Sequence, residues 1–361
     1  MKQLIAFRVD SGHKIGVGHV MRCLTLATAL KLRAVESFFI CRSSVGSIEE
    51  SIESEGFRVY RLPPASKAYA PLKGLMHGDF LACSQAEDAE LTLSILESQE
   101  TVCAIIVDQY GIDRTWDEIL PDKYKIFKID DLADREHDCD GLVDQNFYNS
   151  LEQRYNQLVP VGAALLLGPK YALLRPQFRD LDIGFRRARS EIKQVLVSFG
   201  GQDPNGYALQ VAGDILKHTK FSVNVMGVSR KVHESAWQEL QTRFGVRLQG
   251  PAYLNDPLGA FDAADIYIGA GGTITWERFA CGLPGIVYSV AENQVEMARD
   301  LESAGMQTYA GNINHYNWID LARHLEPLSD AVNRWLLSQR LRAEVDGKGV
   351  ERVIEEWGLG G

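Results

Sequence analysis

The sequence predicts an α/β protein built from two doubly wound parallel-sheet domains. Short apolar runs with the character of buried strands alternate with stretches of helical periodicity, the pattern typical of parallel sheets. The alternation restarts at Gln194, after a connector that contains several prolines. The chain has 361 residues, which is too long for one ordinary domain. We therefore expect two Rossmann-like domains facing a cleft, over residues 1–155 and 191–361, joined by a connector over residues 156–190.

The composition is that of an ordinary globular protein, with 45% apolar and 24% charged residues. The formal net charge of −10 and the lack of a basic run argue against a nucleic acid partner. No apolar run is long enough to span a membrane, and the first residues do not resemble a signal peptide. The six cysteines show no metal-binding or redox spacing, so we expect reduced core thiols and a cytoplasmic location.

The first domain is expected to begin with a strand over Leu4–Val9, a glycine loop, and a helix over His19–Leu32. The loop reads Gly-Val-Gly-His over residues 16–19. It is not a dinucleotide fingerprint, because Met21 occupies the third glycine position, and it is not a P-loop, because no Gly-Lys-Ser/Thr follows. A lone histidine is more often structural than catalytic. His19 nevertheless directly follows a loop without obstructing side chains, so we predict that it is catalytic, with Asp10 orienting its ring.

Polar residues follow later strands of the first domain. An apolar strand over Val102–Val107 ends in Asp108, Gln109 and Tyr110, and a strand over Tyr124–Ile129 ends in two aspartates. We predict that Tyr110 contacts the substrate together with Gly16, Gly18 and Arg22. The remaining elements expected here are strands at 37–41, 59–62 and 141–144, helices at 47–55 and 86–98, and an unpatterned loop at 63–80.

The second domain contains the stretch on which the functional interpretation depends, GAGGTITWERFACGLPGIVYSVAENQ over residues 269–294. A strand over Asp265–Ile268 leads into a glycine turn, a helix opens at Thr273, and a strand over Gly285–Val290 follows. Glycine turns at helix N-termini allow backbone N–H groups to approach a phosphate closely. Strand carboxyl ends are also where open α/β sheets bind ligands. We predict a nucleotide diphosphate site at Gly271, Gly272, Thr273, Glu277, Glu292, Asn293 and Gln294, in which Glu277 accepts from the ribose hydroxyls.

A similar turn follows the strand at 194–199, where Gly200 and Gly201 precede a helix expected from Asn205. We predict that these glycines also bind phosphate. Further strands are expected at 222–226 and 246–248, and residues 316–361 are expected to be mostly helical, ending with a helix at 350–357. For the stretch at 269–294, the alternative is a βαβ unit whose glycines serve only tight packing.

Two Asp-x-Asp patterns, at 138–140 and 180–182, raise the possibility of a divalent metal site. Metal-dependent sugar-nucleotide transferases use such a pair, but the pattern is short and common by chance. Backbone dipoles at the glycine turns can stabilise a diphosphate without a metal. We therefore expect no metal and no cofactor.

The combination of a GxGH loop and a GGxTxxE stretch resembles the GT-B architecture, and GAGGTITWE is similar to the nucleotide site of the lipid II-forming N-acetylglucosaminyltransferase. The chain is more similar to the UDP-sugar hydrolases of pseudaminic acid biosynthesis. Segments of that family occur in order along most of the chain: IGVGHVMRCLTLA, VDQYGID, IDDLADREHDCDGLVDQN, LLLGPKYALLRPQF, VLVSFGGQDP, the stretch at 269–294, and VDGKGVERV. The sequence departs from the family at Gly271–Ile274, where a Ser-Thr pair is more usual, and in the loop at 63–80.

The resemblance implies hydrolysis of UDP-2,4-diacetamido-2,4,6-trideoxy-β-L-altropyranose at the anomeric C–O bond, with inversion and release of UDP. It also implies a catalytic role for His19 and a contact from Asn293 to pyrophosphate or sugar. UDP is a stable leaving group, so the chemistry needs charge stabilisation and a base for water, and an imidazole suits the second task. Three alternatives remain: a metal-independent glycosyltransferase of the same architecture, a hydrolysing epimerase, and a nucleotide-sugar-binding protein without turnover.

Overall fold

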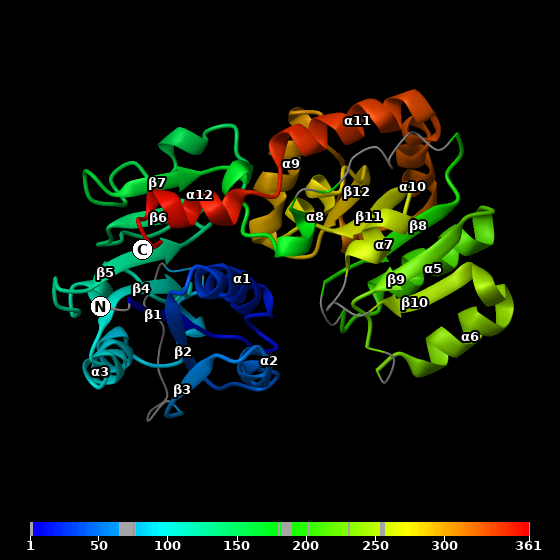
Figure 1. Ribbon diagram of the computed structural model, residues 1–361. Coiled ribbons are helices and arrows are strands. Elements are labelled where there is room, and N and C mark those ends of the chain that lie inside the picture. The colour runs from blue at the N-terminus through cyan, green and yellow to red at the C-terminus, as the bar shows by residue number, and fades with distance from the viewer. Residues whose placement is uncertain are drawn as a thin grey trace. The chain divides into compact units, whose positions relative to one another are not determined.

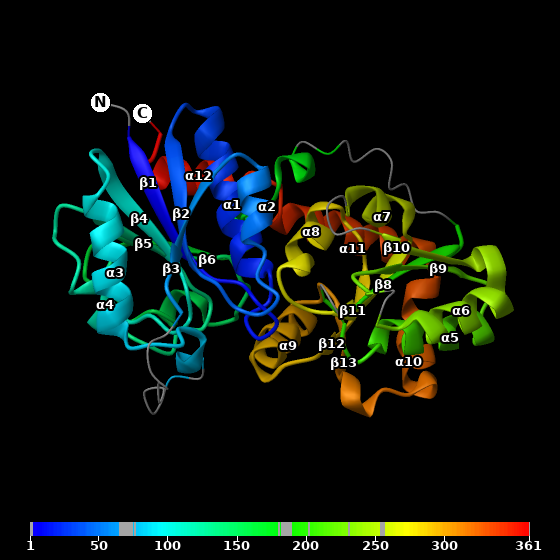
Figure 2. The same ribbon diagram turned by 90° about the horizontal axis from the view of Figure 1, so that it is seen from below.

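The computed structural model describes residues 3–64, 75, 77–179, 181, 190–200, 203–229, 232–252 and 257–360. The chain divides into two compact units. Unit 1 comprises residues 1–146, 150–176 and 348–361, and unit 2 comprises residues 147–149 and 177–347. The predicted second domain over 191–361 differs from this grouping, because Lys348–Gly361 belongs to unit 1. The predicted fold class is confirmed, since each unit contains a parallel sheet with helices on its faces (Figures 1 and 2).

Unit 1 contains a seven-stranded parallel sheet in the order β3-β2-β1-β4-β5-β6-β7. Its strands are β1 (Leu4–Val9), β2 (Glu36–Arg42), β3 (Arg58–Leu62), β4 (Val102–Asp108), β5 (Lys125–Ile129), β6 (Gly141–Asp144) and β7 (Ala164–Leu167). Its α-helices are α1 (Gly18–Leu32), α2 (Glu49–Ser54), α3 (Gln85–Glu97), α4 (Arg114–Asp117) and α12 (Gly349–Glu356). Strand β7 lies inside the range predicted as a connector, for which no strand was predicted.

Unit 2 contains a six-stranded parallel sheet in the order β10-β9-β8-β11-β12-β13. Its strands are β8 (Gln194–Ser198), β9 (Ser222–Met226), β10 (Leu248–Ala252), β11 (Ile266–Ala270), β12 (Gly285–Ser289) and β13 (Thr308–Asn312). Its α-helices are α5 (Tyr207–His218), α6 (Glu234–Phe244), α7 (Leu258–Ala263), α8 (Ile274–Ala280), α9 (Val295–Ser303), α10 (Trp318–Leu325) and α11 (Ala331–Glu344). Apolar residues of α5, α6 and α10 pack on one face of this sheet, and α7, α8 and α11 lie on the other (Figure 2).

Both sheets reverse their strand order at one point. In unit 1 the order turns at β1 and β4, which pair with Val9 opposite Asp108. In unit 2 it turns at β8 and β11, which pair with Ser198 opposite Gly269. The crevice outside the carboxyl ends of such a strand pair is where open α/β sheets bind their ligands. The topology therefore directs attention to the residues that follow these four strands.

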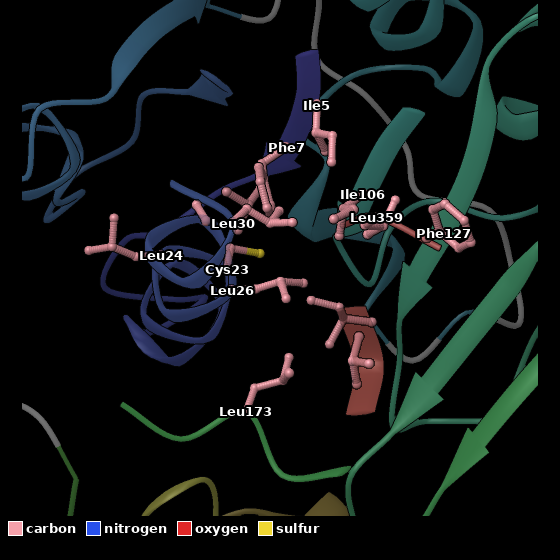
Figure 3. Close-up of a cluster of buried hydrophobic side chains, with 14 of the residues drawn as sticks. Ile5, Phe7, Cys23, Leu24, Leu26, Leu30, Ile106, Phe127, Leu173 and Leu359 are labelled. Carbon is pink, nitrogen blue, oxygen red and sulfur yellow. The ribbon is translucent and has the colours of Figure 1, made fainter. Parts of the chain in front are cut away.

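The core of unit 1 is completed by the C-terminal end of the chain. Apolar side chains of β1, β4 and β5 pack against α1 and against residues of the α12 segment, including Leu359 (Figure 3). Trp357 stacks on Phe127, with ring centroids 4.6 Å apart. Val353 and Ile354 are fully buried. Burying side chains of this size contributes about 1.5–3 kcal/mol each, so the last turns of the chain hold unit 1 together.

Replacing Trp357 by alanine should therefore destabilise unit 1. Its side chain is 3% exposed, and removal of a buried tryptophan typically costs about 3–5 kcal/mol in the free energy of unfolding. Urea unfolding followed by circular dichroism would measure the loss. Trp335→Ala serves as the control, because Trp335 on α11 is 42% exposed and its removal should cost under about 1 kcal/mol. Equal losses in the two variants would contradict the packing described for α12.

Candidate functional site

The central feature of unit 1 is a buried carboxylate that contacts a histidine and an arginine. Asp108, the last residue of β4, lies 2.6 Å from Nδ1 of His19 through its Oδ1. The Arg22 guanidinium donates to both oxygens of this carboxylate, from Nε at 2.6 Å and from its terminal nitrogen at 2.7 Å. His19 and Arg22 are both on α1, one turn apart, so they face the same strand end. All three side chains are buried.

The charge state of Asp108 determines which nitrogen of His19 carries a proton. Burial alone would raise the pKa of Asp108, but the charges and hydrogen bonds of Arg22 and His19 oppose it and hold the pKa well below its usual range. An ionised carboxylate only accepts hydrogen bonds. The Nδ1 of His19 must therefore be the donor, and in a neutral ring this leaves the lone pair on Nε2. The arrangement provides an imidazole base that is fixed in orientation and tautomer.

Tyr110 and Asp131 extend the same network. Arg22 donates to Oδ2 of Asp131 at 3.0 Å, and the Tyr110 hydroxyl donates to Oδ1 of the same carboxylate. The Tyr110 ring also meets the His19 ring edge-on, with centroids 4.5 Å apart. Burial, followed by the charge of Asp131, raises the pKa of Tyr110, so its hydroxyl keeps its proton. Arg22 directs three of its donors to carboxylates of unit 1 and so positions Asp108, while its predicted substrate contact stays a prediction.

The predicted role of Asp10 in orienting His19 is wrong, because the structure gives it to Asp108. Asp10 accepts hydrogen bonds from the Arg8 side chain at 2.5 Å, from the backbone N–H of Arg42 at 2.6 Å and from Gln109 at 2.8 Å. These bonds belong to a buried ionic network in which Asp88 joins Arg8 and Arg42. Asp10 therefore stabilises the structure at the carboxyl end of β1. Removing Asp10 or Arg8 would leave the other as an uncompensated buried charge.

The loop before α1 is closed on itself by its backbone. Gly12 and Gly16 exchange N–H···O=C hydrogen bonds, and Gly16 has a φ of 85°, in the left-handed region that favours glycine. Gly18 is the first residue of α1, directly before His19. The predicted glycine loop is therefore observed, and it presents His19 at the carboxyl end of β1.

In unit 2, the predicted nucleotide residues gather at the carboxyl ends of β11 and β12, which are neighbours in the sheet. Gly269 needs to be a glycine, because a Cβ there would lie 1.9 Å from the carbonyl oxygen of Ser198. Gly272 has a φ of 133°, and its N–H donates to Oγ1 of Thr275 at 3.3 Å. Gly271 is buried and Thr273 is exposed at the start of α8.

Glu277 and the segment after β12 lie on that same edge of the sheet of unit 2. Glu277 is in the first turn of the seven-residue α8 and is half-buried. Glu292, Asn293 and Gln294 form a single 3₁₀ turn after β12, in which Glu292 and Asn293 are exposed. Oε1 of Gln294 accepts from the N–H of Val290 at 3.0 Å, so this side chain shapes the turn.

The predicted phosphate site after β8 is not open in the way the sequence suggested. Helix α5 begins at Tyr207 rather than at Asn205. The carboxylate of Asp203 accepts from the N–H groups of Tyr207 at 3.1 Å and of Ala208 at 2.8 Å. It therefore occupies the donors that a phosphate would need at this helix N-terminus. Gly200 is exposed with a φ of 102°, whereas Gly201 lies outside the described residues.

The Asp-x-Asp patterns do not form a metal site among the described residues. The Asp140 side chain accepts from the N–H of Ile126 at 2.8 Å, and Asp138 donates its own N–H to Asp117. Residues 180 and 182 lie outside the described ranges. Over residues that are described, no cluster of three or more His, Cys, Asp or Glu side chains has the spacing of a metal centre. Likewise, none of the described helices has the length and hydrophobicity required to cross a bilayer.

A second buried acidic group lies close to the first network. Asp144, at the end of β6, shares the Tyr155 hydroxyl with Asp130, at 3.1 and 3.0 Å. One hydroxyl proton can serve only one of the two oxygens at a time, and the other partners of Asp144 are the N–H of Asn146 at 2.9 Å and Nε of Arg154 at 3.5 Å. Burial raises the pKa of Asp144 to about 8 and the charge of Asp131 adds to the rise, which the Asn146 N–H and Arg154 only partly offset.

This titration predicts a pH-dependent stability. Between the ordinary pKa of an aspartate, about 4, and about 8, the folded chain holds a proton on Asp144 that the unfolded chain has lost. The free energy of unfolding therefore falls as the pH rises through this window and levels off above it. Asp144→Asn removes the effect, so the variant should gain at least about 1 kcal/mol over the wild type between pH 5 and pH 9. Urea unfolding of both proteins at pH 5 and pH 9 measures this difference. An equal change in the free energy of unfolding in the wild type and in Asp144→Asn would contradict the assignment.

Sequence reasoning missed Asp108 and Asp131 as members of the site. Asp108 ends β4, and Asp131 closely follows the neighbouring strand β5. A charged residue at the ends of two neighbouring strands was the sequence signal that could have identified them. The partner of His19 could not be found by proximity in sequence, because Asp108 is 89 residues away.

Comparisons with known proteins identify distant relatives, although no protein-family model matches the chain. A Campylobacter jejuni UDP-2,4-diacetamido-2,4,6-trideoxy-β-L-altropyranose hydrolase is 26% identical over 61% of this chain and 68% of its own length. The Bacillus subtilis spore coat polysaccharide biosynthesis protein SpsG is 22% identical over 95% and 94%. Methanocaldococcus jannaschii protein MJ1062 is 23% identical over 89% of this chain, which spans only 63% of that relative.

Solved structures with the same fold include CalG4, the calicheamicin glycosyltransferase. MurG of Acinetobacter baumannii superposes with a TM-score of 0.64 at 13% identity, over 98% of this chain and 99% of that one. LpCGTa in complex with UDP superposes with a TM-score of 0.65 at 14% identity, over 99% of both chains. At these identities the likeness concerns the fold alone, which is of the GT-B type.

Proposed function

We propose that this GT-B protein, a distant relative of the altropyranose hydrolase and of SpsG, is an enzyme that acts on a UDP-linked sugar. More specifically, it hydrolyses a UDP-linked 2,4-diacetamido-2,4,6-trideoxy hexose of the L-altrose type to UDP and free sugar. The observation that carries the proposal is the Asp108–His19 pair, a buried and oriented base at the point where the first sheet reverses its strand order.

In this reaction, Nε2 of His19 takes a proton from water while the water oxygen attacks the anomeric carbon. The C–O bond to UDP breaks, and its electron pair stays on the diphosphate oxygen. Attack from the side opposite to the leaving group inverts the anomeric centre. Because UDP is already a stable anion, the protein needs to place a base and stabilise charge, and it needs no strong general acid.

Unit 2 supplies the nucleotide site in this proposal. Glu277 accepts hydrogen bonds from the ribose hydroxyls, while the backbone N–H groups at Gly271 and Gly272 and the Asn293 side chain bind the diphosphate. The support is their common position at the carboxyl ends of β11 and β12, beside the strand-order reversal of the second sheet. Gly200 can add a backbone contact, but α5 is not proposed as a phosphate site because Asp203 caps it.

A glycosyltransferase is the second candidate, because a neighbour of the same fold is described as one and the fold alone does not separate transfer from hydrolysis. Such an enzyme would use the same UDP site and the same base, with an acceptor hydroxyl in place of water. The hydrolase has the support of the C. jejuni relative and of the family segments that occur along the chain. Product analysis without an acceptor separates the two.

His19→Ala should lower turnover by at least about a hundredfold, because an oriented base typically contributes on the order of 10²–10⁴-fold. Asp108→Asn should lower it by a similar factor, because Asn can no longer fix the tautomer of the ring. Calorimetry should show that both variants still bind UDP. His13→Ala is the matched control, since His13 is an exposed histidine of the same loop, and it should retain turnover. Near-normal turnover in His19→Ala would remove His19 from the mechanism.

Glu277→Ala should weaken UDP binding and raise KM more than it lowers kcat, because the ribose contact is made equally in the ground and transition states. The control is Glu239→Ala, which removes an exposed glutamate from α6 of the same unit. Calorimetric titration with UDP measures the effect. Unchanged UDP affinity in the Glu277 variant would count against the assignment.

The reaction itself is tested by mixing the protein with the UDP-linked diacetamido-trideoxy-altrose in ¹⁸O-labelled water, without an acceptor. UDP and free sugar should form in equal amounts, and the label should enter the sugar because attack is at the anomeric carbon. Label in UDP would mean attack at phosphorus. Release that requires an added acceptor would favour the glycosyltransferase.

A further inference from the structure

A short turn of unit 1 lies against the same strand end as the Asp108–His19 pair. The turn is the 3₁₀ helix η1 (Gly78–Phe80), preceded by His77. Gln109, next to Asp108, donates from its side chain to the carbonyl oxygen of Phe80 at 3.2 Å. A Cβ on Gly111 would lie 2.8 Å from Leu81 and 3.1 Å from the carbonyl oxygen of Gly78. The turn is therefore packed closely over the carboxyl end of β4.

This packing places three rings beside the base, which we call the aromatic wall: His77, Phe80 and Tyr110. His77 and Phe80 have centroids 4.7 Å apart, and both stack on Tyr110, at 5.5 and 6.2 Å. Tyr110 in turn meets His19 edge-on at 4.5 Å. Tyr110 is buried, whereas His77 and Phe80 are only half-buried. The accessible surface of the wall is therefore formed by His77 and Phe80.

The wall is also connected to the loop that carries His19. Lys14, between the two hydrogen-bonded glycines of that loop, forms an ion pair with Asp79, and its Nζ lies 5.9 Å from the centre of the Phe80 ring. The ion pair is exposed on both sides and stabilises little by itself. Ring stacking and the close contact at Gly111 hold the turn in place. The Lys14–Asp79 ion pair links the turn to the loop that carries His19.

The accessible surface of the aromatic wall is mainly apolar. Nε2 of His77 is buried and makes no hydrogen bond to any described residue. Burial, partly offset by Asp134 and Asp79, lowers the pKa of His77, so its ring is neutral at neutral pH. Faces of aromatic rings favour methyl groups and disfavour hydroxyls, which lose hydrogen bonds to water there.

We propose that His77 and Phe80 determine the sugar specificity of the site, by selecting sugars that carry deoxy and N-acetyl substituents over fully hydroxylated ones. The inference rests on the proposed function, because a sugar attacked by water at His19 must lie beside this wall. The methyl groups of such a sugar, including those of its acetamido groups, pack on the accessible parts of the two rings. Neither residue touches the reacting atoms, so their effect is on which sugar is accepted.

The test compares two ligands, the UDP-linked 2,4-diacetamido-2,4,6-trideoxy-altrose and UDP-N-acetylglucosamine, which keeps hydroxyls at C4 and C6. Affinity is measured by calorimetry for each ligand and for UDP alone, in the wild type and in Phe80→Ala. The ratio of the two sugar-nucleotide affinities should fall by at least about tenfold in the variant, in line with the loss of one aromatic contact surface. The affinity for UDP should stay within about twofold.

Two further variants keep the result interpretable. Phe80→Leu retains apolar volume with a smaller perturbation of the turn, and its ratio should fall between those of the wild type and Phe80→Ala. Tyr60→Ala removes a half-buried ring from the edge strand β3 and should leave the ratio unchanged. An unchanged ratio in both Phe80 variants, or an equal loss of affinity for UDP itself, would overturn the proposal.

The same titrations separate this inference from the proposed function. Binding does not require hydrolysis, so a glycosyltransferase with this wall would show the same ratio and the same loss in Phe80→Ala. If the wild type binds UDP but neither sugar nucleotide better than UDP, the proposed substrate class fails. If it binds the diacetamido sugar with preference and Phe80→Ala retains that preference, the substrate class stands and the role of the wall is wrong.

Discussion

The site of unit 1 depends on one carboxylate shared between a base and a guanidinium. Asp108 is buried, and an isolated charge there would be costly, so its ionised form exists because Arg22 compensates it from one side. The same ionised form makes the carboxylate an acceptor for His19 on the other side. Asp131 then neutralises the remaining charge of Arg22 and receives the Tyr110 hydroxyl. Each member therefore makes the burial of the next one possible.

The two units apply the same topological principle to different ligand groups. In unit 1 the reversal of strand order falls between β1 and β4, and it brings together a helix start after β1 and an aspartate at the end of β4. In unit 2 the reversal falls between β8 and β11, and close approach of the backbones requires Gly269. The first arrangement holds side chains that can move a proton. The second leaves backbone and a half-buried glutamate at the strand ends, which suits a nucleotide.

The sequence predicted the class of fold and most strands, because buried parallel strands are short apolar runs that end in glycine or polar residues. For the same reason it predicted that His19 and Glu277 lie near the start of helices that follow strands, while their roles stay predictions. It could not predict that Asp108 rather than Asp10 holds His19, since both aspartates end a strand next to the helix and only the packing of Arg8, Arg42 and Gln109 decides between them.

Three other differences between the predicted and the observed structure also have physical causes. Strand β7 is only four residues long and partly exposed, so its pattern was too weak to separate from a connector. The grouping of α12 with unit 1 depends on contacts with α1, about three hundred residues earlier, which no local pattern encodes. The cap on α5 was missed because the helix was expected from Asn205, whereas it begins at Tyr207 and the Asp203 side chain accepts from its first N–H groups.

The central claim is that Asp108 fixes His19 in the tautomer that leaves Nε2 free to accept a proton. The most direct measurement is ¹⁵N NMR of the histidine rings in the substrate-free protein at a pH where the ring is neutral, with His19→Ala used to assign the signal. The account predicts that the His19 ring carries its hydrogen on Nδ1, and that Asp108→Asn loses this preference. A ring protonated on Nε2 in the wild type would contradict it, because the base would then have no lone pair facing the reaction.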